Sequence, residues 1–293
     1  MEIPTQKPPS AWQPLTPRGV AAFAQASLGR LLLAQFLVAL SIAGAVVWFV
    51  HVGWFSVISA ALDRLPPTGE IQSSTLKWPG ETPQILAENR FLAVAVDLEH
   101  NGTARSPAHV QVEFGQNDVR VLTLFGDWQR SYPAHWTVEF NRSELKPWWG
   151  AWAPALLAAV AGLVIIALLM NWAALASVYF FGAWLIAFFK NRALTLGGSW
   201  QLAAAALLPG AFFMLGALLL YGFGMLDLIQ LTALFIFHFF LGWIYLVCST
   251  LAAPLLFSDM KANPFVAPQS QPLQSEKEPP LAPKCEVPSE RGE

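Results

Sequence analysis

The chain has 293 residues, of which 55% are hydrophobic and only 12% are charged. Soluble domains typically carry about 25% charged residues, so this composition indicates a membrane protein and argues against an ordinary soluble domain. The net charge of −2 does not provide the basic surface that nucleic-acid binding requires, so we expect no nucleic-acid partner.

Residues 1–30 are predicted to form a polar N-terminal tail that leads into a first transmembrane helix over residues 31–62. The second range contains no charged residue, and about 20 helical residues cross a hydrocarbon core of about 30 Å. An apolar run of this length is typical of an uncleaved signal anchor rather than of a cleaved signal peptide. Because Arg18 and Arg30 precede the run, we expect the N-terminus to lie in the cytoplasm.

Residues 63–147 show a different pattern, in which apolar and polar residues alternate. Within residues 109–114 the apolar residues share one face, and Gln111 and Glu113 lie on the opposite face. A period of two is typical of an antiparallel sheet with one buried face and one face in water. We therefore predict a small extracytoplasmic β domain here, with Gln111 and Glu113 exposed to solvent.

Residues 148–257 are predicted to form a transmembrane helical bundle, because they contain only three charged residues. A single helix over residues 153–189 would be about 55 Å long, well beyond one span. The length favours a tight hairpin at Asn171-Trp172, with a span on either side of it. Further spans are expected over residues 201–223 and 229–257.

This arrangement gives about five spans, although four are also possible. Pro209-Gly210 is expected to kink the span in which it lies. If the run before Lys190 is instead one long protruding helix, then Lys190 and Arg192 lie on the cytoplasmic side, as the positive-inside tendency favours. The predicted fold is an α-helical integral membrane protein with a small extramembrane antiparallel β domain inserted after the first span.

The C-terminal residues 258–293 contain seven prolines, six acidic and four basic residues. Such a segment buries too little apolar surface to fold, so we predict a disordered tail. Cys248 lies in an apolar run and Cys285 in this tail, and we therefore expect no disulfide between them.

Three short motifs resemble those of bacterial polytopic membrane proteins related to the Yip-type five-helix family. They are Phe188-Phe189-Lys190-Asn191-Arg192, Ser199-Trp200-Gln201-Leu202 and Leu207-Leu208-Pro209-Gly210. This resemblance covers the helical part better than the sheet domain. It implies a scaffold or a membrane-organising factor rather than an enzyme, and it transfers no catalytic residue.

His238 is the main candidate for an intramembrane polar site, because ionisable groups inside a bilayer are costly and often functional. Asp227 and Gln230 precede it by about three and two helical turns, so the three side chains are expected to form a partly polar stripe. A proton or ion path would need such groups. The alternative is a neutral histidine that makes one interhelical hydrogen bond.

The sheet domain also contains several residues of the types that bind metals. His100, His109 and His135 occur there together with Asp97 and Glu99. Metal sites need converging ligands at defined spacing, and the loose spacing here favours a solvated sheet edge. We therefore predict no metal site and no cofactor.

Motifs of familiar enzymes are absent from the sequence, among them the Walker loop and the paired Cys-x-x-Cys. We expect a non-enzymatic scaffold or binding protein of the bacterial inner membrane, with the lipid bilayer and another membrane or extracytoplasmic protein as partners. A sheet edge is a ready site for a partner strand. The alternative is a small transporter or channel subunit that uses His238 and Asp227.

Overall fold

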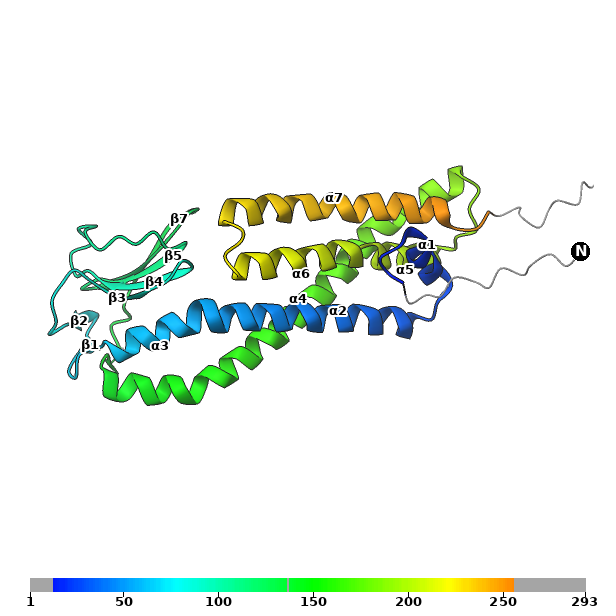
Figure 1. The fold of residues 1–293 in the computed structure, drawn as a ribbon. Helices are drawn as coiled ribbons and strands as arrows, with labels where there is room; N and C mark the ends of the chain where they lie inside the picture. Colours follow the sequence, from blue (N-terminus) through cyan, green and yellow to red (C-terminus); the bar gives the residue numbers. More distant parts are fainter. Residues whose placement is uncertain (1–12, 136, 256–293) are drawn as a thin grey trace, which may run out of the picture.

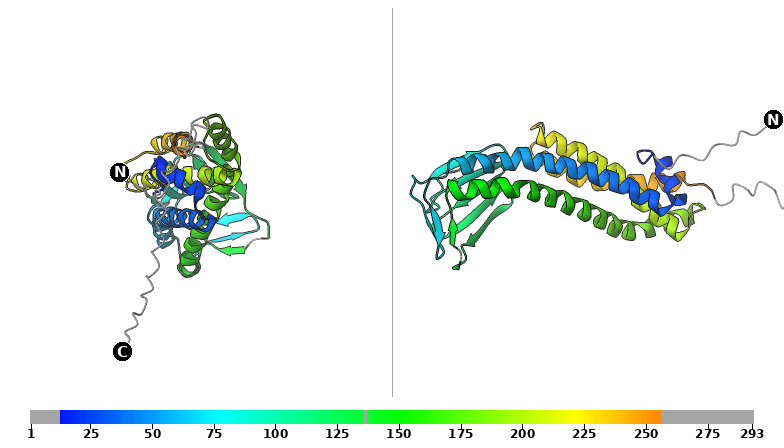
Figure 2. Two further views of the ribbon diagram at one scale, coloured as in Figure 1. Left: turned by 90° about the vertical axis from the view of Figure 1, so that its right-hand side faces the viewer. Right: turned by 90° about the horizontal axis from the view of Figure 1, so that it is seen from below.

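The computed structural model describes residues 13–135 and 137–255. The predicted disordered tail over residues 258–293 and the first twelve residues of the N-terminal tail lie outside this part. The molecule is elongated, with the sheets at one end and a bundle of helices extending away from them (Figure 1, Figure 2).

Helices make up most of the described chain. In chain order they are α1 (Pro17–Ala22), η1 (Phe23–Gln25, a 3₁₀ turn), α2 (Leu28–Val50), η2 (His51–Phe55, a π-helical turn), α3 (Ser56–Asp63), α4 (Arg142–Phe189), α5 (Leu196–Ala206), α6 (Leu208–Gly222) and α7 (Leu228–Ala252). Four helical stretches of the described residues are long and apolar enough to cross a membrane: Leu28–Asp63, Arg142–Phe189, Leu196–Gly222 and Leu228–Ala252.

Part of the predicted N-terminal tail folds onto the far end of the bundle. α1 begins after Thr16, whose Oγ1 accepts a hydrogen bond from the Gly19 N–H at 3.1 Å, and this bond caps the helix. Val20 and Phe23 are fully buried where α1 and η1 pack on α5 and α7. The chain is therefore already folded before it enters the first long helix.

α4 is one continuous helix of 48 residues, so the predicted hairpin at Asn171-Trp172 is wrong. That pair contains neither glycine nor proline, and Trp172 is buried within the bundle. The length of about 72 Å does not have to fit inside one bilayer, because the first turns of α4 extend beyond the bundle beside α3. There the Trp149 Nε1–H donates to Ser59 Oγ at 3.0 Å.

The predicted kink near Pro209 is confirmed as a break between α5 and α6 at Leu207. Proline has no N–H and its ring crowds the preceding turn, which removes a helical hydrogen bond and favours a kink or a break. α5 lies deep in the bundle, where Leu202 and the four alanines that follow it are fully buried. Gly210 of α6 lies against the backbone of His238 in α7, where an added Cβ would approach the His238 carbonyl oxygen to 3.2 Å.

The residues between α3 and α4 form two small sheets. The larger has the order β3 (Gln84–Glu88), β4 (Leu92–Val96), β5 (Val110–Phe114), β6 (Asp118–Thr123), β7 (Gly126–Ser131), and the smaller has the order β2 (Thr75–Lys77), β1 (Glu70–Gln72), β8 (Thr137–Glu139). The smaller sheet is antiparallel. In the larger sheet β4 and β5 run parallel, so the prediction of a purely antiparallel domain is wrong at this pair.

One face of the larger sheet forms the core of the domain. Leu92, Val94 and Val96 of β4 pack there with Val57 and Ala61 of α3. The smaller sheet contributes Ile71 and Leu76 to the same core. Because α3 continues the first long helix, this core connects the sheets directly to the helices.

The opposite face of the larger sheet is covered as well, which corrects the predicted exposure of Gln111 and Glu113. Gln111 is 3% exposed and Glu113 is 0% exposed. Parallel strands need a crossover connection, and here the loop over residues 97–109 runs back across the sheet and covers this face. The predicted alternation of apolar and polar residues is confirmed in β5, but the polar face contains a buried hydrogen-bond network.

Candidate functional site at the junction of sheets and helices

The turn between β3 and β4 connects the sheet domain to the helices. Arg90 in this turn donates from Nη1 to the Gly224 carbonyl at 2.6 Å and from Nη2 to the Leu226 carbonyl at 2.8 Å. Gly224 follows α6 with a φ of +75°, a left-handed conformation that glycine adopts readily at the end of a helix. A fixed cation of the sheet domain thus binds the turn between α6 and α7.

Asn89 makes a second connection, to the first long helix. Its Nδ2 donates to the Gly53 carbonyl at 2.7 Å, and its Oδ1 accepts from the N–H groups of Phe91 and Leu92 at 2.8 and 2.9 Å. Gly53 lies in the π-helical turn η2, where an added Cβ would approach the Phe91 ring to 3.2 Å. The close approach of the strand turn to the helix therefore favours glycine at this position.

Aromatic rings fill the space between these two connections. The His109 Nδ1 lies 2.7 Å from the Tyr221 hydroxyl, and the two rings are stacked at 5.7 Å. Phe91 lies at 5.2 Å from Tyr221 and at 5.1 Å from Phe49 of α2, measured between ring centroids. Burial lowers the pKa of His109 and the positive charge of Arg90 lowers it further, against the opposite effect of Asp227. His109 is therefore a neutral partner of Tyr221 at pH 7.

A cleft of about 430 Å³ opens beside His109. It lies between the crossover loop, the β6–β7 hairpin and the start of α7. Its polar lining residues are Arg105, Ser106, His109, Gln111, Thr123 and Asp227. The cleft therefore has a polar wall on the sheet side and opens at the level where the helices begin.

The buried polar network lies behind this cleft and centres on His100. The His100 ring bonds to Glu113 through Nδ1 and to Asp118 through Nε2, the latter at 2.5 Å. Gln111 Nε2 donates to the Ala104 carbonyl at 2.7 Å and to Glu113 at 3.1 Å. These contacts hold the crossover loop on the sheet.

The charges in this network favour a protonated His100. Burial opposes the charged ring, but the hydrogen bonds to Glu113 and Asp118 outweigh it and raise the pKa of His100. For Asp118, burial acts to raise the pKa, and the bonds from His100 and Gln129 lower it overall. The hydrogen bonds to Glu113 and Asp118 thus favour the imidazolium form of His100.

The structure does not bring the candidate metal ligands together. His100 is engaged with Glu113 and Asp118, His109 contacts Tyr221, and His135 is exposed. Within residues 13–135 and 137–255, no group of three His, Cys, Asp or Glu side chains has an arrangement that could hold a metal ion.

The predicted intramembrane site is not assembled either. Asp227 and Gln230 form a capping box at the start of α7. The Gln230 N–H donates to Asp227 Oδ1 at 2.7 Å, and the Asp227 N–H donates to Gln230 Oε1 at 2.9 Å. His238 bonds through Nδ1 to the Phe235 carbonyl of its own helix. The three residues therefore lie on one helix without forming a shared polar site.

Sequence reasoning overlooked His51. It is an ionisable residue within the uncharged run over residues 31–62, and this signal is visible in the sequence. It opens the π-helical turn η2, and such turns are frequent at functional sites. His51 lines a groove of about 420 Å³ between the first long helix and α4, together with Ser59 and Trp149.

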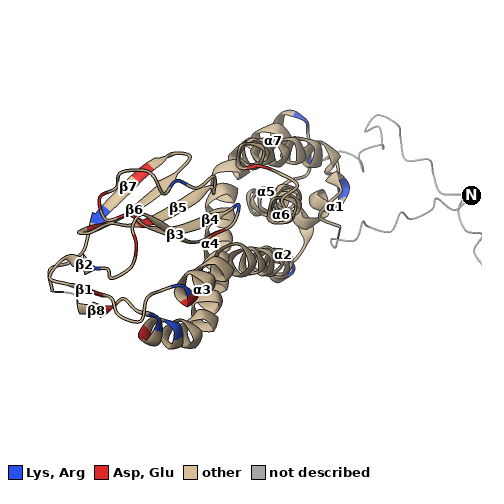
Figure 3. Ribbon diagram, turned by 60° about the vertical axis from the view of Figure 1, so that its left-hand side comes forward, with Lys and Arg blue, Asp and Glu red and all other residues tan. Residues whose placement is uncertain are grey.

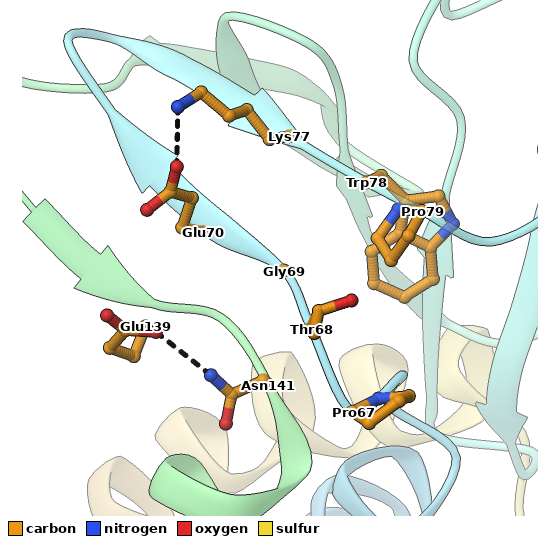
Figure 4. A pocket seen from close by; sticks show the side chains of 9 residues that line it. All are labelled: Pro67, Thr68, Gly69, Glu70, Lys77, Trp78, Pro79, Glu139 and Asn141. Atoms are coloured by element: carbon orange, nitrogen blue, oxygen red, sulfur yellow. Dashed lines mark hydrogen bonds and ion pairs between the residues drawn. The ribbon is translucent and has the colours of Figure 1, made fainter.

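A further hollow of about 540 Å³ lies on the smaller sheet (Figure 4). Lys77 and Glu70 form an ion pair at 2.5 Å, and Asn141 donates to Glu139 at 3.1 Å. Because its charged side chains already have partners, this hollow is a weaker candidate for a ligand site than the cleft beside His109.

Comparisons with protein-family models, with curated proteins and with solved structures gave no match to the chain.

Proposed function

We propose that the chain is a membrane-anchored scaffold or binding protein that crosses the bacterial inner membrane four times. It holds the sheet domain outside the cytoplasm and binds an extended segment of a partner protein along β7. The resemblance to the Yip-type family favours the same class of function, and kinship with that family is part of the proposal.

The apolar surface of the helices supports a membrane location. Large apolar side chains lie exposed along the described helices, among them Leu163, Ile166 and Val178 of α4 and Phe240 of α7. Contiguous apolar surface on this scale is expected only where lipid or protein covers it. The four long helices run side by side, and the lipid bilayer is their natural partner.

The distribution of charge supports the orientation. With α4 as one helix, the end far from the sheets carries Arg18, Arg30, Lys190 and Arg192, and the described residues at that end include no acid (Figure 3). Cations near span ends mark the cytoplasmic side. From the sequence, the length of the apolar run favours five spans and the positions of the cations favour four. With α4 as one helix, both the helix count and the cations favour four spans.

The single observation that carries the binding function is the exposure of β7. All six of its residues are exposed, and among the described strands it pairs only with β6. The other edge strand, β3, packs against α3 and contains a register shift between Ile85 and Ala87. The larger sheet therefore has one protected edge and one open edge.

The hydrogen-bond pattern of the hairpin shows which backbone groups are available. The Tyr132 N–H donates to the Asn117 carbonyl at 3.0 Å. Hydrogen-bonded pairs alternate in an antiparallel ladder, so the N–H groups of Asp127, Gln129 and Ser131 point away from β6. A partner strand adds to a sheet through such groups, and neighbouring side chains provide specificity.

The transporter alternative receives less support from the described residues. It requires polar groups that converge between helices near the bilayer centre. Asp227 and Gln230 satisfy each other at the start of α7, and His238 bonds to its own helix. The sheet domain, by contrast, is hydrogen-bonded to the helices at the junction through Asn89 and Arg90, which suits a binding platform.

A photo-crosslinking amino acid at Trp128 of β7 tests the proposed edge in native membranes. We expect one specific protein adduct, because this side chain is 58% exposed beside the open edge. The same probe at Glu99, an exposed residue on the crossover loop, is the matched control.

Ser131→Pro provides the second arm of this experiment. Proline removes an N–H that points away from β6, and edge strands tolerate proline at positions whose N–H does not pair with the neighbouring strand. We expect the Trp128 adduct to disappear while the protein keeps its abundance and melting temperature. An adduct that persists in Ser131→Pro, or that forms equally from Glu99, would contradict binding along β7.

A further inference from the structure

We propose that one phospholipid with an anionic headgroup binds under the β6–β7 hairpin. Its acyl chain lies in an apolar groove beneath Phe125, and its headgroup lies in the cleft at Arg105 and His109. The inference rests on the proposed membrane location, and it adds a ligand site to the proposed function.

The tip of the β6–β7 hairpin exposes two large apolar side chains. Leu124 is 60% exposed and Phe125 is 77% exposed, although the tip belongs to a domain that we place outside the membrane. The tip points toward the start of α7 (Figure 1). Two adjacent large apolar side chains in a two-residue turn suit contact with lipid better than contact with water.

A groove of about 410 Å³ lies between this tip and the helices. Its apolar lining residues are Ile42, Phe125, Met214, Leu218, Leu231 and Phe235. Thr232 also lines the groove, but its hydroxyl donates to the Leu228 carbonyl of its own helix at 2.8 Å. The one polar side chain of the groove thus uses its hydroxyl proton within its own helix, and the apolar lining suits a hydrocarbon chain.

The depth of the groove matches the outer half of a bilayer. Phe235 lies eight residues beyond Asp227 along α7, which corresponds to about 12 Å. A hydrocarbon core is about 30 Å thick, so the groove begins near the headgroups and ends within the acyl chains.

The cleft beside His109 and the groove lie next to each other at the hairpin tip. Leu124 lines the cleft and Phe125 lines the groove, and the start of α7 lines both. The combined site is polar where headgroups lie and apolar where acyl chains lie. A phospholipid has the same two halves in the same order.

The charges of the cleft favour an anionic headgroup. Arg105 is exposed and has no hydrogen-bond or ion-pair partner among the described residues. Of the nearby acids, Asp227 caps α7 and Glu88 accepts from Ser106 Oγ at 2.6 Å. Arg90 adds positive charge beside the cleft while it binds two carbonyls. The free guanidinium of Arg105 is therefore the group that would bind a phosphodiester.

Native mass spectrometry of the full chain in detergent tests the site. Phosphatidylglycerol and phosphatidylcholine with identical acyl chains are the probes, and we expect the protein to retain phosphatidylglycerol preferentially. Arg105→Gln should reduce that preference about tenfold, because a charge-assisted bond to phosphate is lost. Leu231→Trp should abolish retention of both lipids, because the indole fills the groove.

Two control variants make the same kinds of substitution at positions away from the proposed lipid site. Lys77→Gln removes a cation of the sheet domain at a distance from the cleft, and Leu163→Trp enlarges an exposed apolar residue of α4. Both controls should retain phosphatidylglycerol like the unmodified protein. Melting temperatures of all four variants show whether any of them fails to fold.

Several outcomes would overturn the inference. They are equal retention of both lipids, full retention by a folded Leu231→Trp variant, binding of inorganic phosphate alone in the cleft, and a protein segment crosslinked to a probe at Phe125. Membrane fractionation separates this inference from the proposed function. A chain that is absent from membranes refutes the membrane location, whereas a membrane-bound chain without a retained lipid refutes only the lipid site.

Discussion

The hydrogen bonds of single residues allow the polar face of the larger sheet to be buried. The imidazole of His100 lies between two carboxylates, and Gln111 satisfies both the crossover loop and Glu113. Buried polar groups are tolerated only when they have partners, and removal of one partner leaves the other unsatisfied. Substitutions in this network should therefore affect the whole crossover loop.

The first prediction concerns the pH dependence of stability. His100 has a raised pKa in the folded state. The contribution of His100 to the free energy of unfolding is therefore fully present at a pH below its unfolded-state pKa of about 6.5. It is lost as the pH rises through the folded-state pKa. The free energy of unfolding of the sheet domain should fall through this window, and thermal unfolding in detergent at a series of pH values measures it.

His100→Gln should remove most of this pH dependence, because glutamine does not titrate. His135→Gln is the matched control, since His135 is exposed and outside the network. An unchanged pH profile in His100→Gln would contradict the assignment of the titration to His100.

The second prediction follows from the burial of Gln111. Gln111→Asp should destabilise the domain by roughly 2–4 kcal/mol, because it places an unpaired carboxylate beside Glu113 and removes a donor to Ala104. Chemical unfolding of the full chain measures the change. Glu99→Gln, on the exposed part of the same loop, should be nearly neutral, and equal stability of both variants would contradict the buried network.

At the scale of elements, the continuity of α4 determines the topology of the chain. A hairpin would return the chain to its starting side, whereas one long helix carries Lys190 and Arg192 to the end that also bears α1. The extra length packs outside the bundle, where Lys146 pairs with Asp63 of α3 at 2.6 Å. Packing against α3 outside the bundle thus accounts for the part of α4 that exceeds the length of one membrane span.

The third prediction tests this topology. A reporter fused after Leu145 should be active only outside the cytoplasm, and one fused after Asn191 only inside it. In the proposed topology a single span separates the two positions, and cations prefer the cytoplasmic side. Alkaline phosphatase and a fluorescent protein, used as complementary reporters, measure the two sides. Reporter activity outside the cytoplasm at both positions would contradict the single span and favour the hairpin at Asn171-Trp172.

At the scale of the whole molecule, the junction makes the sheets and helices one unit. Arg90 binds the turn between α6 and α7, Asn89 binds η2, and α3 continues into the core of the sheet domain. A partner on β7, as proposed, would therefore be held at a defined orientation to the helices. The same junction positions the hairpin tip beside α7, as the proposed lipid site requires.

The fourth prediction concerns this coupling. Arg90→Gln removes a guanidinium that bonds two carbonyls, so local opening of residues 223–227 should become easier. Hydrogen exchange of the backbone amides there should increase about tenfold, which corresponds to the loss of a charge-assisted bond. Lys77→Gln should leave exchange in this turn unchanged. Unaltered protection in Arg90→Gln would show that the turn is stable without the sheet domain.

The sequence by itself determined the features that depend on local patterns. The segregation of charge separated the helical regions from the sheet domain, period two indicated strands, and Pro209 marked a break. Each of these signals arises from neighbouring residues, because backbone geometry and burial act over a few turns or strand pairs.

Only the tertiary structure decided the rest, because the relevant partners are distant in the sequence. Arg90 bonds to carbonyls 134 and 136 residues away, and His109 contacts a tyrosine 112 residues away. The parallel pairing of β4 and β5 turned an apparently solvated polar face into a buried network. The packing of α3 beside α4 allowed one helix where length alone suggested two. Contacts of this range depend on how the elements are arranged in space, and local periodicity does not contain that information.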